Sequence, residues 1–408
     1  MRSILTLNAG SSSLKFALFG LAGVHPSRLL GGQIASNHNG ASFHVKDATG
    51  LTLAHRQLDA RGAALDPTEA LEVLIEWLPT AMTRLDLAAI GHRVVHGGPD
   101  YSLPAVLDAK VIAELTRLAP LAPLHQPFNL EGIAAARAAF PGVPQIACFD
   151  TAFHSGQTFE EAAFGLPRSY YDEGIRRYGF HGLSYDYVTR QLAQIAPGIA
   201  DERVVIAHLG NGASLCGVRD GRSMTSTMGF SALDGLVMGT RCGGIDPGVL
   251  LYLMAEKRMD AAALTQLLYR DSGLKGLSGV SHDMRALEDS VAPEAAQAIA
   301  CFVGRIRREI GALTAAMGGI DALVFTGGIG EHSARIRSDV AAGFDWLGLA
   351  IDPDRNTDDA VELSALTSRV RIFRIPTDEE AMIARHVVGL LAAAASDLVP
   401  IEQVRWVA

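Results

Sequence analysis

A glycine-rich stretch at residues 324–333 limits what this chain can fold into more than any other feature. An apolar run over residues 321–325 is typical of a buried strand, three glycines follow within residues 327–330, and a helix-like pattern begins near Ser333. A strand, a glycine-rich turn and a helix N-terminus can hold an anion or a nucleotide, because bare backbone approaches the ligand and N–H groups point toward it. The stretch therefore predicts either such a cradle or only a tight turn.

Two other glycine-rich turns, at residues 8–13 and 208–214, favour the cradle. No Lys-Ser or Lys-Thr pair follows the glycines of residues 324–333, and their spacing is not that of GxGxxG. The stretch is thus neither a Walker A loop nor a dinucleotide-binding fingerprint.

Length and composition predict a compact protein of two domains. The chain has 408 residues, which exceeds one typical core, and it is 49% hydrophobic and 19% charged. A net charge of −9 argues against nucleic acid or an anionic membrane as the main partner, but not against a small anionic substrate. Residues 1–19 do not resemble a signal peptide, and no apolar run approaches the ~20 residues of a membrane span. Four cysteines without CxxC spacing are typical of reduced thiols, so we expect a cytoplasmic protein.

The order of the expected elements indicates α/β domains with mixed sheets. Residues 204–208 and 213–218 form an expected hairpin that echoes the expected strands at 3–7 and 14–19, which suggests two halves built on one plan. Further strands are expected before residue 58 and over residues 88–95, 145–149 and 370–375, and helices are expected from an N-cap at Asp66, near 108–118 and 129–139, from Ser184, within 246–318 and after Thr377.

Three polar residues stand where catalytic groups are common. Asp150 ends an apolar strand, Arg93 lies in a strand beside apolar residues, and Arg241 lies among glycines and small residues in a long loop. Each arginine alone could be a solvated surface group. Together they fit phosphoryl transfer, which needs arginines to spread charge, a carboxylate to hold Mg²⁺ and bare backbone for phosphates.

The histidines allow a different interpretation, a zinc hydrolase. His92 and His96 are four residues apart, and other histidines lie near glycines or strand ends. No HExxH motif is present, and a four-residue spacing on a strand does not bring two rings together. The zinc interpretation therefore stays open with little support.

Taken in order, the motifs resemble those of the acetate/propionate/butyrate kinase family, within the sugar kinase, Hsp70 and actin superfamily. The resemblance covers essentially the whole chain. Its motifs are LNAGSSSLKF at residues 7–16, GHRVVHGG at 91–98, FDTAFH at 149–154, RYGFHG at 177–182, HLGNG at 208–212, MGTR at 238–241, the glycine-rich stretch at 324–333 and TDEE at 377–380.

The resemblance implies two related βββαβαβα domains of the actin-like ATPase or ribonuclease H-like kind, with a nucleotide cleft between them, in a homodimer. Residues 1–150 and 380–408 would form one domain, and residues 151–379 the domain that carries the adenosine site. The implied reaction is ATP + acetate ⇌ ADP + acetyl phosphate with Mg²⁺ as the cofactor, for which Mn²⁺ could substitute.

The resemblance also implies roles for residues at matching positions. Asp150, His181 and Arg241 would be catalytic, and Asn8 and Glu379 would hold the metal. Arg93, Val95, Leu124, His125 and Phe180 would bind the carboxylate substrate; Lys15, His208, Leu209, Gly210, Asn211, Gly212, Asp283, Met284, Arg285, Gly328, Ile329, Gly330, Glu331 and His332 would bind the nucleotide.

Elementary chemistry agrees with direct in-line transfer. A carboxylic acid with a pKa of roughly 4 to 5 is ionised at neutral pH, so the nucleophile needs no strong base. The difficulty is to bring two anions together, and the guanidinium groups of Arg93 and Arg241 suit both carboxylate and phosphoryl oxygens.

Two positions depart from the family pattern. Ala232 stands where proline is common, which could loosen the acyl pocket and admit propionate or another short acid. His332 stands where asparagine is common beside the adenine, so the preference for a purine base is less firmly implied.

Two rival functions use the same superfamily fold. A kinase that acts on a sugar would need a general base, whereas the arginine pair favours an anionic acceptor. A nucleotide-switched binding protein would need a partner-binding domain, for which no linker is visible.

Overall fold

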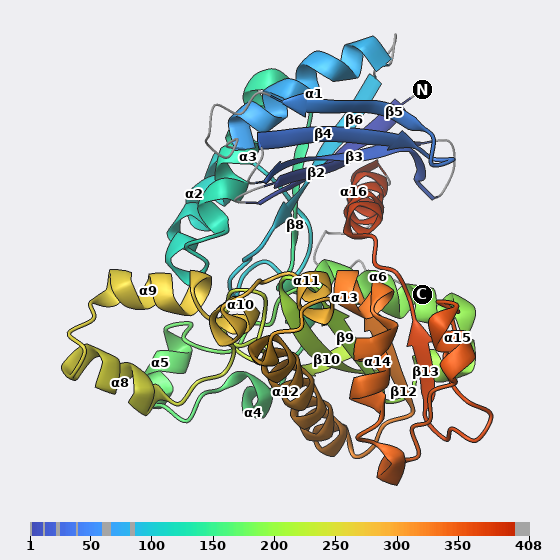
Figure 1. Ribbon diagram of the computed structural model, residues 1–408. Helices are drawn as coiled ribbons and strands as arrows, with labels where there is room; N and C mark the ends of the chain where they lie inside the picture. The colour runs from blue at the N-terminus through green and yellow to red at the C-terminus, as the bar shows by residue number, and fades with distance from the viewer. Residues whose placement is uncertain are drawn as a thin grey trace. The chain divides into compact units, whose positions relative to one another are not determined.

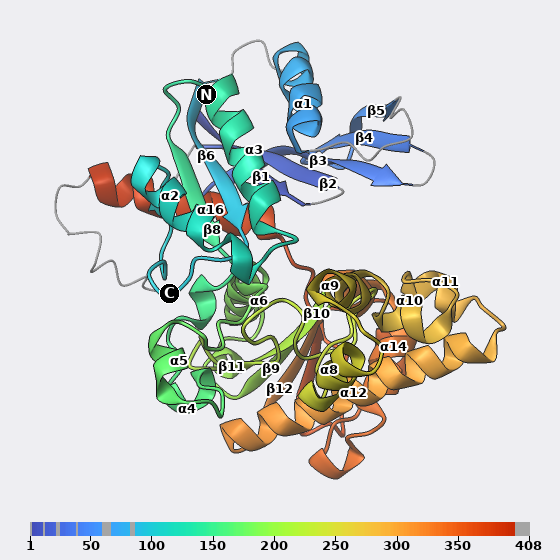
Figure 2. The same ribbon diagram turned by 90° about the vertical axis from the view of Figure 1, so that its left-hand side faces the viewer.

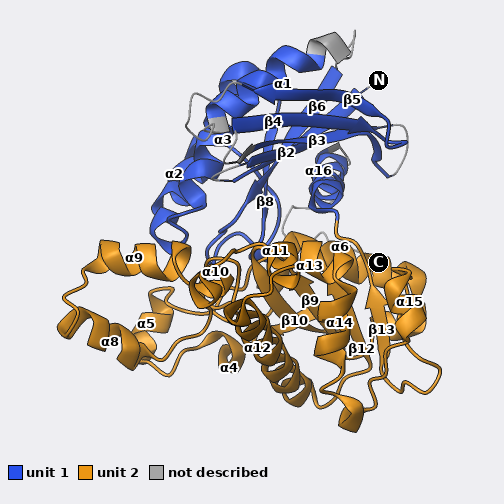
Figure 3. Cartoon of the chain, in the orientation of Figure 1, with its two compact units in different colours: residues 1–152, 378–408 blue, residues 153–377 orange. Residues whose placement is uncertain are grey.

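The computed structural model describes residues 2–10, 13–21, 25–37, 40–58, 67–81 and 86–395. The chain divides into two compact units (Figure 3). Unit 1 consists of Met1–Ala152 and Asp378–Ala408, and unit 2 of Phe153–Thr377. The predicted N-cap Asp66, the turn residues Ser11 and Ser12 and the predicted domain end at 396–408 lie outside the described residues.

Unit 1 contains a sheet in the order β5-β4-β3-β2-β1-β6-β8-β7. The first five strands pair antiparallel, β6 and β8 extend the sheet parallel to β1, and β7 closes the edge antiparallel to β8. The strands are β1 (Arg2–Ala9), β2 (Ser13–Gly20), β3 (Ser27–Asn37), β4 (Gly40–Asp47), β5 (Thr52–Leu58), β6 (Asp86–Val94), β7 (Ala105–Val106) and β8 (Gln145–Phe149).

Helices cover both faces of this sheet (Figures 1 and 2). Alternate residues of a strand point to opposite faces. Phe16 and Leu18 of β2 therefore pack in one core with α1 and α3, whereas Ala17 and Phe19 pack against Ala384 of α16 on the other face. The helices of unit 1 are α1 (Pro67–Ala81), α2 (Ala109–Arg117), α3 (Gln126–Ala139) and α16 (Glu379–Ala395), with short 3₁₀ turns at Ala119–Leu121 and Ala152–His154, the second of which runs into unit 2.

Unit 2 contains a sheet in the order β11-β10-β9-β12-β13, in which β9, β10 and β11 pair antiparallel and β12 and β13 extend the sheet parallel to β9. Unit 1 has the same core order, β3-β2-β1-β6-β8, with the same directions. The predicted relation between the two halves is therefore confirmed. The strands are β9 (Val204–Leu209), β10 (Ala213–Arg219), β11 (Arg222–Ser226), β12 (Ala322–Thr326) and β13 (Arg371–Arg374).

Two helices flank the sheet of unit 2. Tyr185 and Val188 of α6 pack in a core with Val204 and Ile206 of β9, and the long helix α12 packs on β10. The helices of unit 2 are α4 (Phe159–Ala162), α5 (Arg168–Asp172), α6 (Gly182–Ile195), α7 (Pro197–Ala200), α8 (Pro247–Ala255), α9 (Ala261–Arg270), α10 (Gly273–Ser278), α11 (Met284–Glu288), α12 (Pro293–Met317), α13 (Gly327–His332), α14 (Ala334–Ala341), a 3₁₀ turn (Asp345–Leu347) and α15 (Pro353–Thr357).

One local prediction is wrong. The glycines of residues 327–330 form the helix α13 rather than an open turn, and Ser333 then caps the separate helix α14. Gly327 has a φ of +76°, which a glycine adopts without strain, and its N–H donates to the side chain of Glu331 one turn later. No helix among the described residues has both the length and the apolar character needed to cross a membrane.

Candidate active site

Four predicted residues of unit 1 meet at one edge of its sheet. Asn8 lies at the end of β1, Arg93 at the end of β6, and Asp150 directly after β8. These strands are parallel, so their carboxyl ends lie together, which is where ligands bind in sheets of this kind. Glu379 joins them as the first residue of α16.

Arg93 is the centre of this cluster. Its Nε lies 3.1 Å from each carboxylate oxygen of Asp150, and its Nη2 lies 2.6 Å from Asp150 Oδ2. Its Nη1 donates to Asn8 Oδ1 at 3.2 Å and lies 3.3 Å from Glu379 Oε2. Asn8 Nδ2 also donates to Glu379 Oε2, at 3.1 Å. The cluster thus places one guanidinium among three oxygen-bearing side chains.

Burial and charge act against each other in this cluster. The Asp150 side chain is 1% exposed. Burial disfavours the charged form of Arg93, but the carboxylates of Asp150 and Glu379 outweigh it and raise the arginine pKa. Burial also raises the pKa of Glu380, and the neighbouring carboxylate of Glu379 adds to the effect. Arg93 therefore stays charged, which an anion-binding role requires.

Two side chains that the sequence analysis missed hold the ends of β1 and β6 in place. Asn129 Oδ1 accepts from Val95 N at 2.9 Å, and its Nδ2 donates to Ala9 O at 2.7 Å. Gln126 bonds both the N–H and the carbonyl of His96. Both amides are buried. Their spacing of three residues on one helix face was the available signal.

Unit 2 brings together a second group of predicted residues. A Cβ added at Gly212 would lie 2.7 Å from Arg241 Nη2 and 3.2 Å from His181 Nε2, so all three residues adjoin and a side chain at Gly212 would displace the guanidinium of Arg241. His181 Nδ1 bonds Ser214 Oγ at 2.8 Å, and its ring stacks on that of His208 with centroids 4.3 Å apart. The backbone of His181 adopts the left-handed helical conformation, with a φ of 59°.

Local contacts orient the residues of this second group. Arg241 Nη1 donates to the carbonyl of Ala232 at 2.6 Å, a bond that does not depend on the side chain at that position. Ser184 Oγ bonds His208 Nδ1 at 2.8 Å, and the N–H of Gly239 donates to the carbonyl of Asn211 at 3.0 Å.

The predicted nucleotide residues lie on neighbouring elements of unit 2. A Cβ at Gly327 would lie 2.8 Å from the carbonyl oxygen of Leu209, so the start of α13 adjoins the turn after β9. Asp283 caps α11 and pairs with the exposed Arg285 at 2.9 Å. Of the remaining predicted residues, Met284 is buried, His332 is exposed, and Gly328, Ile329, Gly330 and Glu331 lie in α13.

The remaining predicted residues come from both units. Lys15 stands opposite Asn8 in the pairing of β1 with β2, and its side chain is exposed. Val95 is buried directly after β6, and Leu124 and His125 are half-buried before α3. Phe180 is buried in unit 2.

The histidines of the zinc interpretation have protein partners. His92 Nε2 bonds the side-chain oxygen of Gln145, and His96 Nδ1 accepts from Gly98 N at 2.9 Å. His154 Nε2 bonds the carbonyl of Phe180 at 3.0 Å, so this nitrogen carries the proton, and its Nδ1 bonds Ser223 Oγ. Among the described residues, no group of three or more His, Cys, Asp or Glu side chains could hold a metal.

We expect these buried histidines to make the protein sensitive to mild acid. Burial lowers the pKa of His92, His96 and His154 to about 4 in each case, against about 6.5 in the unfolded chain. The unfolded chain therefore binds more protons between these values, so stability is complete above pH ~6.5 and falls as the pH drops toward ~4. The slope approaches about 1.4 kcal/mol per pH unit for each histidine, while Glu380, with its raised pKa, acts in the opposite sense.

Calorimetry between pH 7 and pH 4.5 measures this slope. His154→Gln should lower the free energy of unfolding at pH 7. It should also reduce the slope of that free energy with pH by about 1.4 kcal/mol per pH unit, which is the contribution of one proton. A melting temperature that does not change between pH 6.5 and pH 5 would show that these rings are not held neutral by burial.

Comparisons with known proteins place the chain among kinases. The model of the acetokinase family matches residues 3–385. An acetate kinase of Methylocella silvestris is 52% identical over 398 residues, covering 96% of this chain and 98% of that protein. The crystal structure of a propionate kinase from Francisella tularensis has a TM-score of 0.86 at 35% identity, covering 95% of this chain and 99% of that one. An acetate kinase from Porphyromonas gingivalis has a TM-score of 0.83 at 34% identity, with 96% and 100% covered. The chain therefore belongs to the acetokinase family.

Proposed function

We propose that this protein is an acetate kinase, which transfers a phosphoryl group reversibly from ATP to acetate and gives acetyl phosphate and ADP. The observation that carries the proposal is the cluster of Asn8, Arg93, Asp150 and Glu379 in a chain of the acetokinase family. We propose that the two units, whose bounds lie within two residues of the predicted domain bounds, act as the two domains of the enzyme. With ATP as a substrate, we expect the protein to act in the cytoplasm.

The positive charge of Arg93 reduces the repulsion between the two anions, acetate and phosphate, which is the main difficulty of the reaction. Acetate is already ionised at neutral pH, so transfer can proceed in line without a strong base. The guanidinium lowers the electrostatic cost of holding acetate near a phosphate. Asp150 holds Arg93 through three contacts and so fixes the direction of its remaining N–H bonds.

The oxygens near Arg93 also fit a divalent cation. Asn8 Oδ1 and Glu379 Oε2 both lie beside Nη1 of Arg93, so they converge on one positive group. Carboxylate and amide oxygens suit Mg²⁺ or Mn²⁺, and Mg²⁺ commonly takes one or two protein ligands together with water and phosphate oxygens. A bound metal would neutralise charge on the ATP phosphates. Asn8 and Glu379 would then turn away from Arg93, which would leave its Nη1 for the acetate carboxylate.

The unit 2 group supports the other half of the reaction. We propose that Arg241 and His181 stabilise charge on the transferred phosphoryl group, and that residues 208–212 contact the phosphates. The start of α13 and residues 283–285 would hold the adenosine part.

Propionate is a second candidate substrate. Ala232 is buried and stands where the family commonly has proline, and one solved structure similar to this chain is a propionate kinase. The difference of one methylene in such a pocket is worth only about 1–3 kcal/mol, so a small change can admit the longer acid.

Hydroxamate formation tests the function. The purified protein is incubated with Mg-ATP, hydroxylamine and, separately, acetate, propionate, butyrate or glucose, and hydroxamate and ADP are followed. Hydroxamate from acetate establishes an acyl-phosphate-forming kinase, and Ala232→Pro should then shift the ranking toward acetate. ADP formed only with glucose, or without any acceptor, would contradict the proposal.

We also propose that a second copy of this chain covers helix α8. Its sequence is apolar on all sides, and every residue is at least partly exposed, including Val249, Leu251, Tyr252 and Met254. An apolar helix that finds no core in its own chain is typical of a subunit interface. The resemblance to a dimeric family makes an identical chain the expected occupant.

Sedimentation measures this prediction. The protein should sediment as a dimer, and Leu251→Asp should weaken dimerisation at least about tenfold, because a charge would be buried in an apolar contact. The matched substitution Leu366→Asp, at a residue that is 98% exposed outside α8, should leave the dimer intact. A wild-type monomer at micromolar concentration would refute the interface.

A further inference from the structure

The side-chain carboxylate of Glu331 connects the start of α13, the predicted nucleotide-binding helix, to Thr377, the last residue of unit 2. Glu331 Oε1 accepts from Gly327 N at 2.9 Å and from Thr377 N at 3.1 Å. Gly327 is the first residue of α13, and Thr377 is the last residue of unit 2. The Glu331 side chain is 13% exposed, so water competes little for these bonds.

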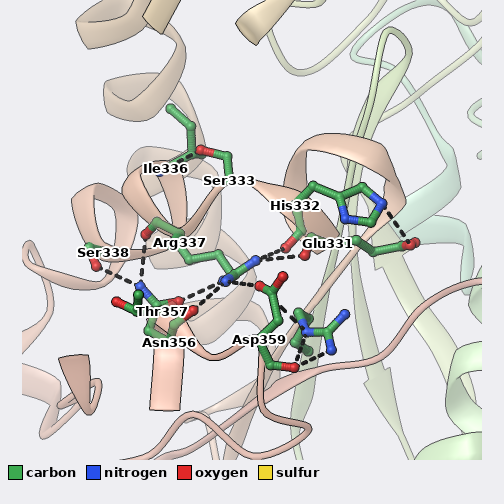
Figure 4. Close-up of polar contacts among 12 residues, drawn as sticks. Glu331, His332, Ser333, Ile336, Arg337, Ser338, Asn356, Thr357 and Asp359 are labelled. Carbon is green, nitrogen blue, oxygen red and sulfur yellow. Dashed lines mark hydrogen bonds and ion pairs between the residues drawn. The ribbon is translucent and has the colours of Figure 1, made fainter. Parts of the chain in front are cut away.

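A buried arginine fixes the backbone of Glu331 (Figure 4). Arg337 is fully buried, and its Nη1 donates to the carbonyls of Gly330 and Glu331 at 3.1 and 2.8 Å. Its Nε and Nη2 donate to Asn356 and Asp359 at 2.7 to 2.8 Å. These contacts use all five N–H donors of the guanidinium. These bonds hold the backbone at the end of α13 in place, so the position from which the Glu331 side chain extends is fixed.

The residues that follow Thr377 have equally firm contacts in unit 1. Asp378 pairs with Arg28 at 2.6 Å and caps α16 through Ala381 N at 2.9 Å. Glu379 is the next residue and contacts Asn8 and Arg93. Three consecutive residues are thus each held by a charged side chain, and the first of these side chains extends from α13.

We propose that Glu331 is a positioning residue for the reaction, which holds Thr377 to α13 and thereby sets the Glu379 carboxylate in the metal-binding cluster. The inference rests on the proposed function, because it assumes that α13 binds the nucleotide and that Glu379 binds the metal.

Chain geometry supports the link. Two residues span at most about 7 Å when fully extended, so the position of Thr377 limits where the backbone of Glu379 can lie. Among the described residues, the buried hydroxyl of Thr377 has no hydrogen-bond partner, which leaves its N–H bond to Glu331 as a main polar contact. A nucleotide that shifts the start of α13 would therefore also shift Thr377, which lies two residues before Glu379 in the chain.

Metal binding tests this role directly. Binding of Mn²⁺ is measured by electron paramagnetic resonance on the full chain in the presence of ADP, and ADP binding is measured by calorimetry without metal. Glu331→Ala should weaken Mn²⁺ binding about tenfold and raise the Mg²⁺ concentration at half-maximal activity by a similar factor, as expected for losing a charge-assisted hydrogen bond. Glu331→Gln keeps the acceptor oxygen, so it should restore most of the affinity.

A matched control separates positioning from general loosening of unit 2. Glu362 is another carboxylate of unit 2, and it pairs with Arg371 of β13 at 2.8 Å without contacting residues 376–378 among its described bonds. Glu362→Ala should lower the melting temperature and leave Mn²⁺ affinity within about twofold of the wild type. If Glu331→Ala weakens only ADP binding and leaves Mn²⁺ affinity unchanged, Glu331 serves α13 alone and the inference is overturned.

A double-mutant cycle gives a second test. Arg28 holds Asp378, so Arg28→Ala loosens the same segment from the unit 1 side. The effects of Glu331→Ala and Arg28→Ala on Mn²⁺ affinity should combine non-additively, whereas independent sites would multiply to within about twofold. The wild-type protein could make no acyl phosphate while its Mn²⁺ affinity still responds to Glu331→Ala and Arg28→Ala as described. That result would overturn the proposed function but would leave the proposed role of Glu331 in place.

Discussion

Asp150→Asn should lower kcat for acetyl phosphate formation by about 10³-fold or more, as expected when preorganised charge at a phosphoryl-transfer site is lost. The carboxylate accepts from both Nε and Nη2 of Arg93. An amide would present an NH₂ group to one of these donors, and with the side chain at 1% exposure water could not relieve that contact. Arg93 would turn toward Glu379 and lose the direction needed for acetate.

Stopped-time hydroxamate assays give kcat, and two controls limit the interpretation. The variant should keep its circular dichroism spectrum and its affinity for ADP, because the predicted adenosine contacts lie in unit 2. Asp150→Glu, which keeps the charge but moves it by one methylene, should retain more activity than Asp150→Asn. Near-normal turnover of Asp150→Asn would exclude Asp150 from any essential part in the reaction.

Arg241→Ala should lower kcat by about 10³-fold with a smaller change in the KM for ATP. An arginine that stabilises the transferred phosphoryl group is commonly worth about 10³-fold or more in phosphoryl transfer. Its Nη1 is held by the carbonyl of Ala232, and its Nη2 adjoins Gly212 and His181, so the group is already directed. Lysine cannot form the same forked contact, and Arg241→Lys should recover only a small part of the loss.

The split between kcat and KM decides this second prediction. A group that acts in the transition state changes kcat, whereas a group that binds both states equally changes KM. A variant with unchanged kcat and a raised KM for ATP would mean that Arg241 binds the ground-state nucleotide. Added guanidinium ion should partly rescue Arg241→Ala, which tests that the missing chemistry, and not the fold, limits the rate.

Most of the strands were predictable because their signals are local. Residues 145–149 are apolar and end at Asp150, and the structure has β8 at Gln145–Phe149. The hairpin around residues 210–212 was predictable because glycine and asparagine favour a tight turn between apolar runs. The helix α13 was not predictable, because glycines usually indicate a turn. Here the side chain of Glu331, a residue of the same helix, accepts a hydrogen bond from the first N–H of the helix, at Gly327.

Buried polar residues were the hardest to foresee. Arg337 lies on a short helix and would normally be assigned to the surface, yet it is fully buried with five acceptors from residues 330–331 and 356–359. Asn129 shares a helix face with Gln126, but that spacing did not identify Ala9 and Val95 as its partners. Such bonds depend on partners distant in the chain, and a local pattern carries no information about them.

The sequence by itself determined the family motifs, the two related halves and the polar residues at the ends of β1, β6 and β8, because strand periodicity and turn chemistry are local properties. Only the tertiary structure decided that Glu379 contacts Asn8, 371 positions earlier, and Arg93. That contact forms because α16 buries Ala384 against Ala17 and Phe19, and the burial of this apolar face brings the first residue of the helix to the cluster.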